Sequence, residues 1–161
     1  THLVHSHSRK PEAMFLNRPG LKVVAPGTAD DAQGLFKAAI RDDDPVLFIE
    51  HKFLYRLIKE ELPADDYIVP IGKANIRRGG KDLTIITWGS MIYVADDAAA
   101  ELAKDGVSVE VIDLRSILPF DEEAILNSVA KTNRVIILHE APLTGGAGAE
   151  FAARIAEKAF D

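Results

Sequence analysis

Short apolar runs alternate with longer segments of helical periodicity along this chain. The apolar run at 21–25 is followed by Pro26, Gly27 and Thr28, which predicts a strand, a turn and a helix capped by the Thr28 hydroxyl. This helix is expected to end near Arg41, before a second apolar strand at 46–49. A strand, a helix and a strand in this order predict a βαβ unit with parallel strands.

The second half of the chain repeats the same alternation three times. Strands are expected at 83–87, 107–114 and 134–139. Each strand is followed by a helix: residues 89–104 with Gly106 as a left-handed cap, a helix introduced by Pro119 and Asp121, and residues from about 146 to 160. The pattern predicts an α/β fold with a small, doubly wound, mostly parallel sheet covered by helices on both faces.

Residues 60–81 separate the two halves and are interpreted as a linker. Proline, glycine and aspartate are frequent there, and apolar residues are scattered. Short edge strands at 67–69 and 73–76 are possible within it, because proline disfavours a central position in a sheet. The basic cluster of Arg77, Arg78 and Lys81 is interpreted as part of a solvated connection.

Composition narrows the classes of partner. The chain has 161 residues, no cysteine and a formal net charge of −6, which argues against nucleic acid or an anionic membrane as the main partner. No apolar run approaches the roughly 20 residues of a membrane span. The first residue is Thr1 and no signal-peptide pattern follows, so we expect a piece of a longer or processed protein.

Three local patterns have both a functional and a structural interpretation. Gly145–Gly148 stands between a strand and a helix, where backbone amides can bind phosphate, but close packing of helix on sheet explains the glycines better. His139 and Glu140 end a strand and could act as acid and base, although a structural histidine is the stronger interpretation. Asp113 and Arg115 could form an ion pair.

Several strings in the correct order resemble one enzyme family. His7-Ser8-Arg9-Lys10-Pro11-Glu12-Ala13-Met14-Phe15, the Pro-Gly-Leu-Lys-Val-Val run at 19–24, and His-Glu-Ala-Pro-Leu-Thr-Gly-Gly at 139–146 are similar to segments of the β subunit of thiamine-diphosphate-dependent 2-oxoacid dehydrogenases, which are related to transketolases. The resemblance implies the end of a pyrimidine-binding domain at 1–59, a linker at 60–81 and a transketolase-type carboxyl-terminal domain at 82–161.

The same resemblance implies a β-subunit portion of an oxidative decarboxylase that acts on pyruvate or a branched-chain 2-oxoacid. Family members are α and β heterotetramers in which thiamine diphosphate and magnesium are bound mainly by α. The carboxyl-terminal domain makes β–β contacts and docks the lipoyl acyltransferase core. The glutamate that activates the coenzyme belongs to an earlier part of β, so we expect this chain to be inactive alone. Bacterial cytoplasm is the expected location, with the mitochondrial matrix as the alternative.

Two candidate sites follow from the resemblance. His7 matches the histidine that assists acyl transfer to lipoyl, with the neighbouring His5 as a competitor and a solvated terminal stretch as the alternative. The carbonyl of Ala39 with Asp42 and Asp44 matches a monovalent cation site, usually for potassium, although the acidic turn could simply be solvated. A rival interpretation of the whole chain is a stand-alone flavodoxin-like module that binds an anion or a partner protein.

Overall fold

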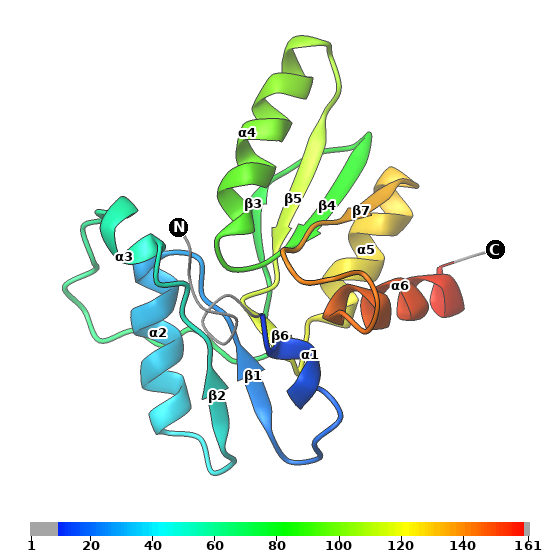
Figure 1. Cartoon of the computed structure of the whole chain (residues 1–161). Coiled ribbons are helices and arrows are strands. Elements are labelled where there is room, and N and C mark those ends of the chain that lie inside the picture. The colour runs from blue at the N-terminus through cyan, green and yellow to red at the C-terminus, as the bar shows by residue number, and fades with distance from the viewer. Residues whose placement is uncertain (1–9, 160–161) are drawn as a thin grey trace.

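Two β-sheets lie side by side, and helices cover them (Figure 1). The computed structural model describes residues 10–159. A four-residue helix, α1 (Glu12–Phe15), leads into the first sheet. No helix among residues 10–159 is long and apolar enough to cross a membrane.

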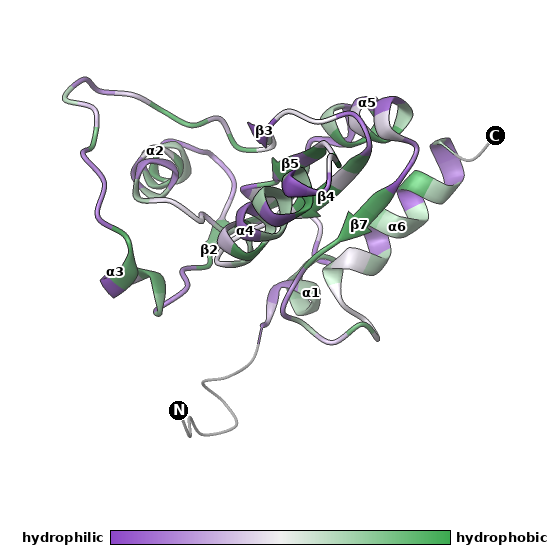
Figure 2. Ribbon diagram, turned by 90° about the horizontal axis from the view of Figure 1, so that it is seen from above, coloured by the Kyte–Doolittle hydropathy of each residue, from purple (hydrophilic) through white to green (hydrophobic). Residues whose placement is uncertain are grey.

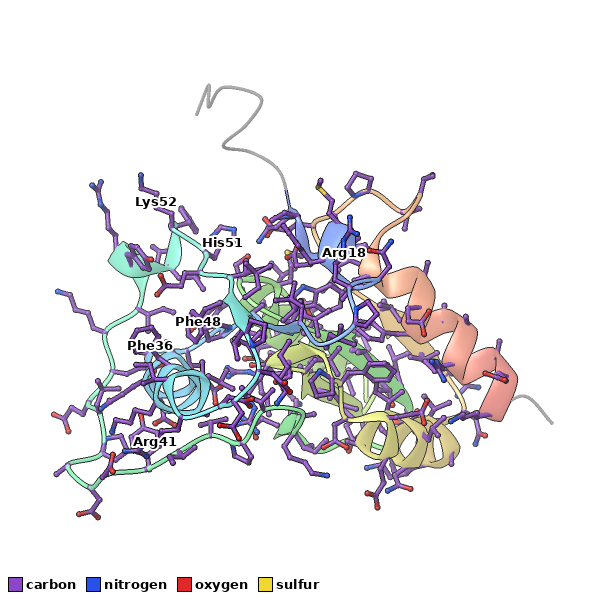
Figure 3. All side chains as sticks on the ribbon, turned by 90° about the horizontal axis from the view of Figure 1, so that it is seen from below. Arg18, Phe36, Arg41, Phe48, His51 and Lys52 are labelled. Atoms are coloured by element: carbon purple, nitrogen blue, oxygen red, sulfur yellow. The ribbon has the colours of Figure 1, made fainter. Side chains whose placement is uncertain are left out.

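The first sheet contains the expected βαβ unit. Strands β1 (Lys22–Val24) and β2 (Val46–Phe48) are parallel, and helix α2 (Ala29–Ile40) connects them. The Thr28 hydroxyl accepts a hydrogen bond from the amide of Asp31, which confirms the predicted cap. Helix α2 covers one face of the sheet, where the rings of Phe36 and Phe48 meet edge to face (Figure 3). Beyond β2, the single-turn helix α3 (Leu54–Leu57) begins the connection to the second sheet.

The second sheet has the strand order β3-β5-β4-β7. Strands β4 (Leu83–Thr87), β5 (Val109–Asp113) and β7 (Val135–Ile137) are parallel, whereas β3 (Asn75–Arg78) runs antiparallel at the edge. Helix α4 (Met91–Lys104) packs on one face, and α5 (Glu122–Thr132) and α6 (Ala147–Lys158) pack on the other. Apolar strands therefore lie between helices with polar outer faces (Figure 2), and the predicted fold class is confirmed.

The two sheets share one apolar core. Val23 and Ile117 from the first sheet pack in the same cluster as Ile86, Ile112 and Phe151 from the second half. All five side chains are almost completely buried. Because each buried aliphatic or aromatic side chain contributes roughly 1.5–3 kcal/mol, this continuous cluster holds the two sheets as one unit.

Two segments depart from the sequence predictions. Residues 116–118 form β6 (Ser116–Leu118), which pairs antiparallel with β1 in the first sheet, although it follows β5 of the second. Residues 67–69 form no strand. Instead, Val69 packs against Leu35 and Gly34 of α2, where a glycine leaves room for the valine.

The turn between β5 and β6 carries a buried polar cluster that connects the sheets. Arg115 has a positive φ of 57°, and its guanidinium donates to Asp31 of α2 at 2.8 Å and to the backbone carbonyl of Lys73. The predicted ion pair between Arg115 and Asp113 is wrong, because the guanidinium points to Asp31. Among the described residues, Asp113 accepts only from the Arg115 amide, through Oδ1, and its other oxygen is buried without a partner.

Burial, together with the carboxylate of Asp31, raises the pKa of Asp113 to about 7. An unfolded aspartate has a pKa of about 3.9, so the native state binds a proton that the unfolded state has released. The stability contributed by protonated Asp113 is therefore complete below about pH 4 and is lost as the pH rises through about 7.

We expect the variant Asp113→Asn to melt at least about 2 °C above the parent chain at pH 8, because its amide carries no charge to bury. At pH 5 the difference between the two melting temperatures should be smaller. Thermal unfolding followed by circular dichroism at both pH values measures this difference. The exposed Asp97→Asn is the matched control, and equal destabilisation by Asp113→Asn at both pH values would contradict the assignment.

Candidate functional site

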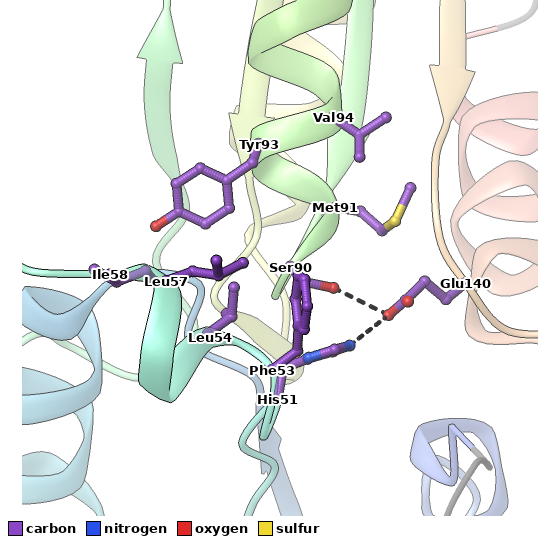
Figure 4. A pocket seen from close by; sticks show the side chains of 10 residues that line it. All are labelled: His51, Phe53, Leu54, Leu57, Ile58, Ser90, Met91, Tyr93, Val94 and Glu140. Atoms are coloured by element: carbon purple, nitrogen blue, oxygen red, sulfur yellow. Dashed lines mark hydrogen bonds and ion pairs between the residues drawn. The ribbon is translucent and has the colours of Figure 1, made fainter. Parts of the chain in front are cut away.

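A cavity of about 400 Å³ lies between the α3 segment and the amino-terminal end of α4 (Figure 4). Its walls are mainly apolar side chains from both elements. They are Phe53, Leu54, Leu57, Ile58, Met91, Tyr93 and Val94. A smaller hollow of about 270 Å³ lies on the other side of the α3 segment, beside the start of α2. The larger cavity has the size and the mainly apolar lining of a ligand-binding site.

Three polar side chains converge at one end of the larger cavity. One carboxylate oxygen of Glu140 accepts from Ser90 Oγ at 3.0 Å and lies 3.2 Å from His51 Nε2. The same oxygen lies 2.7 Å from the Lys10 ammonium. Glu140 thus joins four segments: the residues before α1, the loop after β2, the start of α4 and the loop after β7.

These contacts stabilise the ionised form of the Glu140 carboxylate. Partial burial opposes its ionisation, but the hydrogen bond and charge of Lys10, with the Ser90 hydroxyl, hold the pKa of Glu140 below its usual value. The carboxylate fixes the orientation of the His51 ring, whose Nδ1 is buried without a hydrogen-bond partner among the described residues.

Ser90 is not arranged as a nucleophile. Its hydroxyl donates to Glu140 rather than to His51, and the lowered pKa of Glu140 makes this carboxylate a weak base for activating a serine. The side chains therefore fit ligand binding, and they do not fit covalent catalysis by a serine.

His139 does not form an acid–base pair with Glu140. Its ring stacks on Trp88, with centroids 5.3 Å apart and planes 11° apart. Its Nδ1 is buried without a partner within residues 10–159. The structural interpretation of His139 is therefore the correct one.

The glycines at 145–148 pack against that histidine. A Cβ on Gly148 would lie 2.5 Å from His139 Nε2, and one on Gly146 would lie 2.9 Å from His139 Cε1. Gly145 has a φ of +70°, as a tight turn into α6 requires. Close packing thus explains these glycines, and the geometry gives no support to a phosphate-binding loop.

The acidic turn after α2 is paired with a lysine. The Lys22 ammonium lies 2.7 Å from each oxygen of Asp42 and 3.2 Å from Asp44 Oδ2. The hydrogen bond from Lys22 lowers the pKa of Asp42, and that contact raises the pKa of Lys22. A lysine side chain therefore supplies the positive charge between the two predicted carboxylate ligands, and Ala39 lies near the end of the same helix.

The other predicted site residues, His5 and His7, lie outside the described residues. Within residues 10–159, no group of three histidine or acidic side chains could hold a metal ion. These residues alone do not fit a magnesium diphosphate group. Arg77, predicted to lie in a solvated linker, instead forms a 2.6 Å ion pair with Asp96 and lies over the Tyr93 ring.

Sequence reasoning missed the polar group formed by His51, Ser90 and Glu140. His51 and Ser90 each follow a parallel strand, a position where α/β folds often place ligand contacts. That signal was present in the sequence, but the pairing of the two strand ends depends on how the sheets pack.

Comparison with known proteins agrees with this architecture. Residues 4–58 match the transketolase pyrimidine binding domain, and residues 72–161 match the transketolase C-terminal domain. The 2-oxoisovalerate dehydrogenase subunit beta of Bacillus subtilis (strain 168) is 53% identical over 151 residues, which are 94% of this chain and 46% of that protein. The pyruvate dehydrogenase E1 component subunit beta of the same organism is 45% identical over 159 residues, 99% of this chain and 49% of that protein.

A solved structure described as a split gene transketolase, inactive beta4 tetramer, has a similar fold, with a TM-score of 0.80 and 26% identity. The match covers 95% of this chain and 50% of that one. This chain spans about half the length of the relatives it matches. From the two matched domains and their order, the chain belongs to the transketolase family.

Proposed function

We propose that this chain is a portion of the β subunit of a thiamine-diphosphate-dependent 2-oxoacid dehydrogenase. The observation that carries this proposal is the 45–53% identity to β subunits over almost the whole chain. The reaction is the oxidative decarboxylation of pyruvate or a branched-chain 2-oxoacid, with transfer of the acyl group to lipoyl. Thiamine diphosphate, when bound, supplies the carbanion chemistry that cleaves the oxoacid.

In this proposal the chain acts only within a larger assembly. Its partners are an α subunit, which holds most of the coenzyme and magnesium, the lipoyl acyltransferase core, and a second β subunit. The shared core between the sheets supports a rigid scaffold that other subunits can contact.

The flavodoxin-like alternative has less support. It assigned an anionic ligand to Gly145–Gly148, but Gly146 and Gly148 are packed against the His139 ring. Space for a ligand lies instead between α3 and α4.

The isolated chain is expected to show no decarboxylation of pyruvate or 2-oxoisovalerate with added thiamine diphosphate and magnesium. Reduction of an artificial electron acceptor measures the reaction, and a complete α and β heterotetramer of a relative is the positive control. Turnover by the isolated chain would overturn the proposal that it acts only in an assembly.

His7 is proposed to protonate the thiolate that forms when the lipoyl disulfide opens, since imidazole can supply a proton near neutral pH. In the complete assembly, His7→Ala is expected to slow lipoyl acylation by roughly 100-fold or more and to leave coenzyme affinity nearly unchanged. Acylation kinetics and coenzyme titration measure the two effects.

His5→Ala is the matched control for His7→Ala. A larger loss of acylation with His5→Ala would transfer the role to His5. Equal loss of acylation and of coenzyme binding in His7→Ala would remove the assignment.

Potassium is proposed to bind the carbonyl of Ala39 with Asp42 and Asp44 only when Lys22 leaves these carboxylates. The parent chain should therefore melt at the same temperature in potassium chloride and in choline chloride. Lys22→Met is expected to gain about 2–4 °C in potassium. Lys37→Met, which removes a different ion pair, is the control, and no potassium response in Lys22→Met would exclude the site.

A further inference from the structure

A chain of hydrogen bonds crosses from the carboxyl-terminal domain to the first turn of α2. The Arg115 guanidinium donates to Asp31 Oδ1 at 2.8 Å, and the Thr28 hydroxyl donates to Asp31 Oδ2 at 3.0 Å. The amide of Asp31 donates back to the Thr28 hydroxyl at 3.1 Å. Arg115 belongs to one matched domain, and Asp31 and Thr28 belong to the other. These three residues are called the interdomain link below.

The guanidinium of the interdomain link is fixed on its other side by neutral acceptors. Its Nε and Nη2 donate to the Lys73 carbonyl at 3.1 and 3.0 Å, and Nη2 also donates to the Ala74 carbonyl at 3.2 Å. The Lys73 ammonium lies 3.7 Å from Asp121. Within residues 10–159, Asp31 is the one carboxylate that pairs with Arg115. The link therefore depends on a single ionic contact.

A second buried acid, Asp113, lies beside the interdomain link. Its side chain is completely buried, and Oδ1 accepts from the Arg115 amide at 3.1 Å. Oδ2 has no partner in the part of the chain that the structure describes. The residues paired with Asp113 in the sheet, Asn75 of β3 and Thr87 of β4, carry no charge. The sheet thus supplies no counter-charge for an ionised Asp113.

The other charged groups near Asp113 come from β3 and α4, and they already have partners. Arg77 of β3 donates to one oxygen of Asp96 at 3.0 and 2.6 Å. Its guanidinium also lies over the ring of Tyr93, the other titratable side chain of α4 here. Two charge-assisted bonds hold Arg77, whereas Arg115 has one. Ionised Asp113 therefore competes more readily for Arg115.

The balance of these groups places the titration of Asp113 near neutrality. Burial raises the pKa of Asp113 most, and the Asp31 carboxylate raises it further. The amide of Arg115 and the two guanidinium groups lower the pKa, which lies at about 7. The buried pair of carboxylates around one guanidinium thus gains its second negative charge in the physiological pH range.

We propose that Asp113 is a proton-dependent latch on the interdomain link. While Asp113 is protonated, the Arg115 guanidinium faces one charged carboxylate, that of Asp31, and the link is fully engaged. When Asp113 releases its proton to solvent, two buried carboxylates share the guanidinium and repel each other, so the first turn of α2 loosens. Only the O–H bond of Asp113 breaks. Neither coenzyme nor 2-oxoacid takes part, so the latch is separate from the function proposed above.

The first turn of α2 forms one wall of the smaller hollow. Residues of this turn and of the loop after β1 line it: Pro26, Gly27, Thr28, Ala29 and Ala32. The parallel strands β1 and β2 end at this hollow, where α/β domains commonly bind ligands. The shared apolar core keeps the sheets in place, so the proton on Asp113 changes the order of this wall and not the arrangement of the domains.

The test measures amide hydrogen exchange in the isotope-labelled full chain by NMR, at pH 5.5 and pH 8. Protection factors remove the effect of pH on the exchange chemistry itself. The protection of the Asp31 and Ala32 amides should fall at least about tenfold at pH 8, the factor that one pKa unit of coupling supplies. The Arg115 Nε–H signal and the Asp113 carboxyl carbon should shift with one midpoint, near the pKa of about 7 of Asp113.

Variants separate the latch from a general effect of pH. Asp113→Asn keeps the shape of the side chain without a charge, so its α2 protection should be the same at both pH values. Arg115→Met should give low protection at both. Lys37→Met removes an ion pair with Asp66 at the other end of α2 and should keep the response of the parent chain. Circular dichroism verifies that each variant is folded.

Several results would overturn this inference. A pH response that persists in Asp113→Asn would assign the loosening to another group. An equal fall in protection throughout α4 would indicate a change in global stability instead of a local latch. Full protection of the α2 amides in Arg115→Met would show that the link does not order this turn. If Arg115→Met does not fold, Asp113→Asn and the two side-chain titrations decide the question.

Discussion

The shared apolar core is the constraint on which the rest of the structure depends. Strands from both sheets contribute to it, and Phe151 of α6 packs there beside Ile112 and Ile117. Around its polar margin, Arg115 connects the turn after β5 to Asp31 of α2. With the sheets fixed in this way, the ends of β2 and β4 stand close enough for His51 and Ser90 to reach the same carboxylate.

Much of this fold could be predicted because its elements are specified locally. Thr28 and Asp121 each accept a hydrogen bond from an amide in the first turn of their helix, and Gly106 adopts the positive φ of a helix end. These signals depend only on neighbours in the sequence. The position of β6 depends on its pairing with β1, almost a hundred residues earlier in the chain. Val69 packs in the space left by the missing side chain of Gly34. Hydrophobic periodicity along the sequence could predict neither contact.

The candidate sites also separate into features set by neighbours in the sequence and features set by distant contacts. Adjacent residues at a strand end suggested a pair of His139 and Glu140, but their side chains have different surroundings, the first an aromatic stack and the second a polar junction. Asp42 lies in the turn between α2 and β2, and its partner is Lys22 of β1, the strand that pairs with β2. Identifying such partners requires the strand register, and residue types alone do not supply it. The glycines at 145–148, in contrast, could be interpreted correctly from the tightness of the turn.

The contribution of β6 to the first sheet has a consequence for biosynthesis. Leu118 reaches its place beside Val23 only after β2, β3, β4 and β5 have been made. A ribosome therefore releases β1 long before the strand that covers its edge, and the nascent first sheet must wait with an open hydrogen-bonding edge and an incomplete core. Until β6 emerges, that edge can pair with other chains.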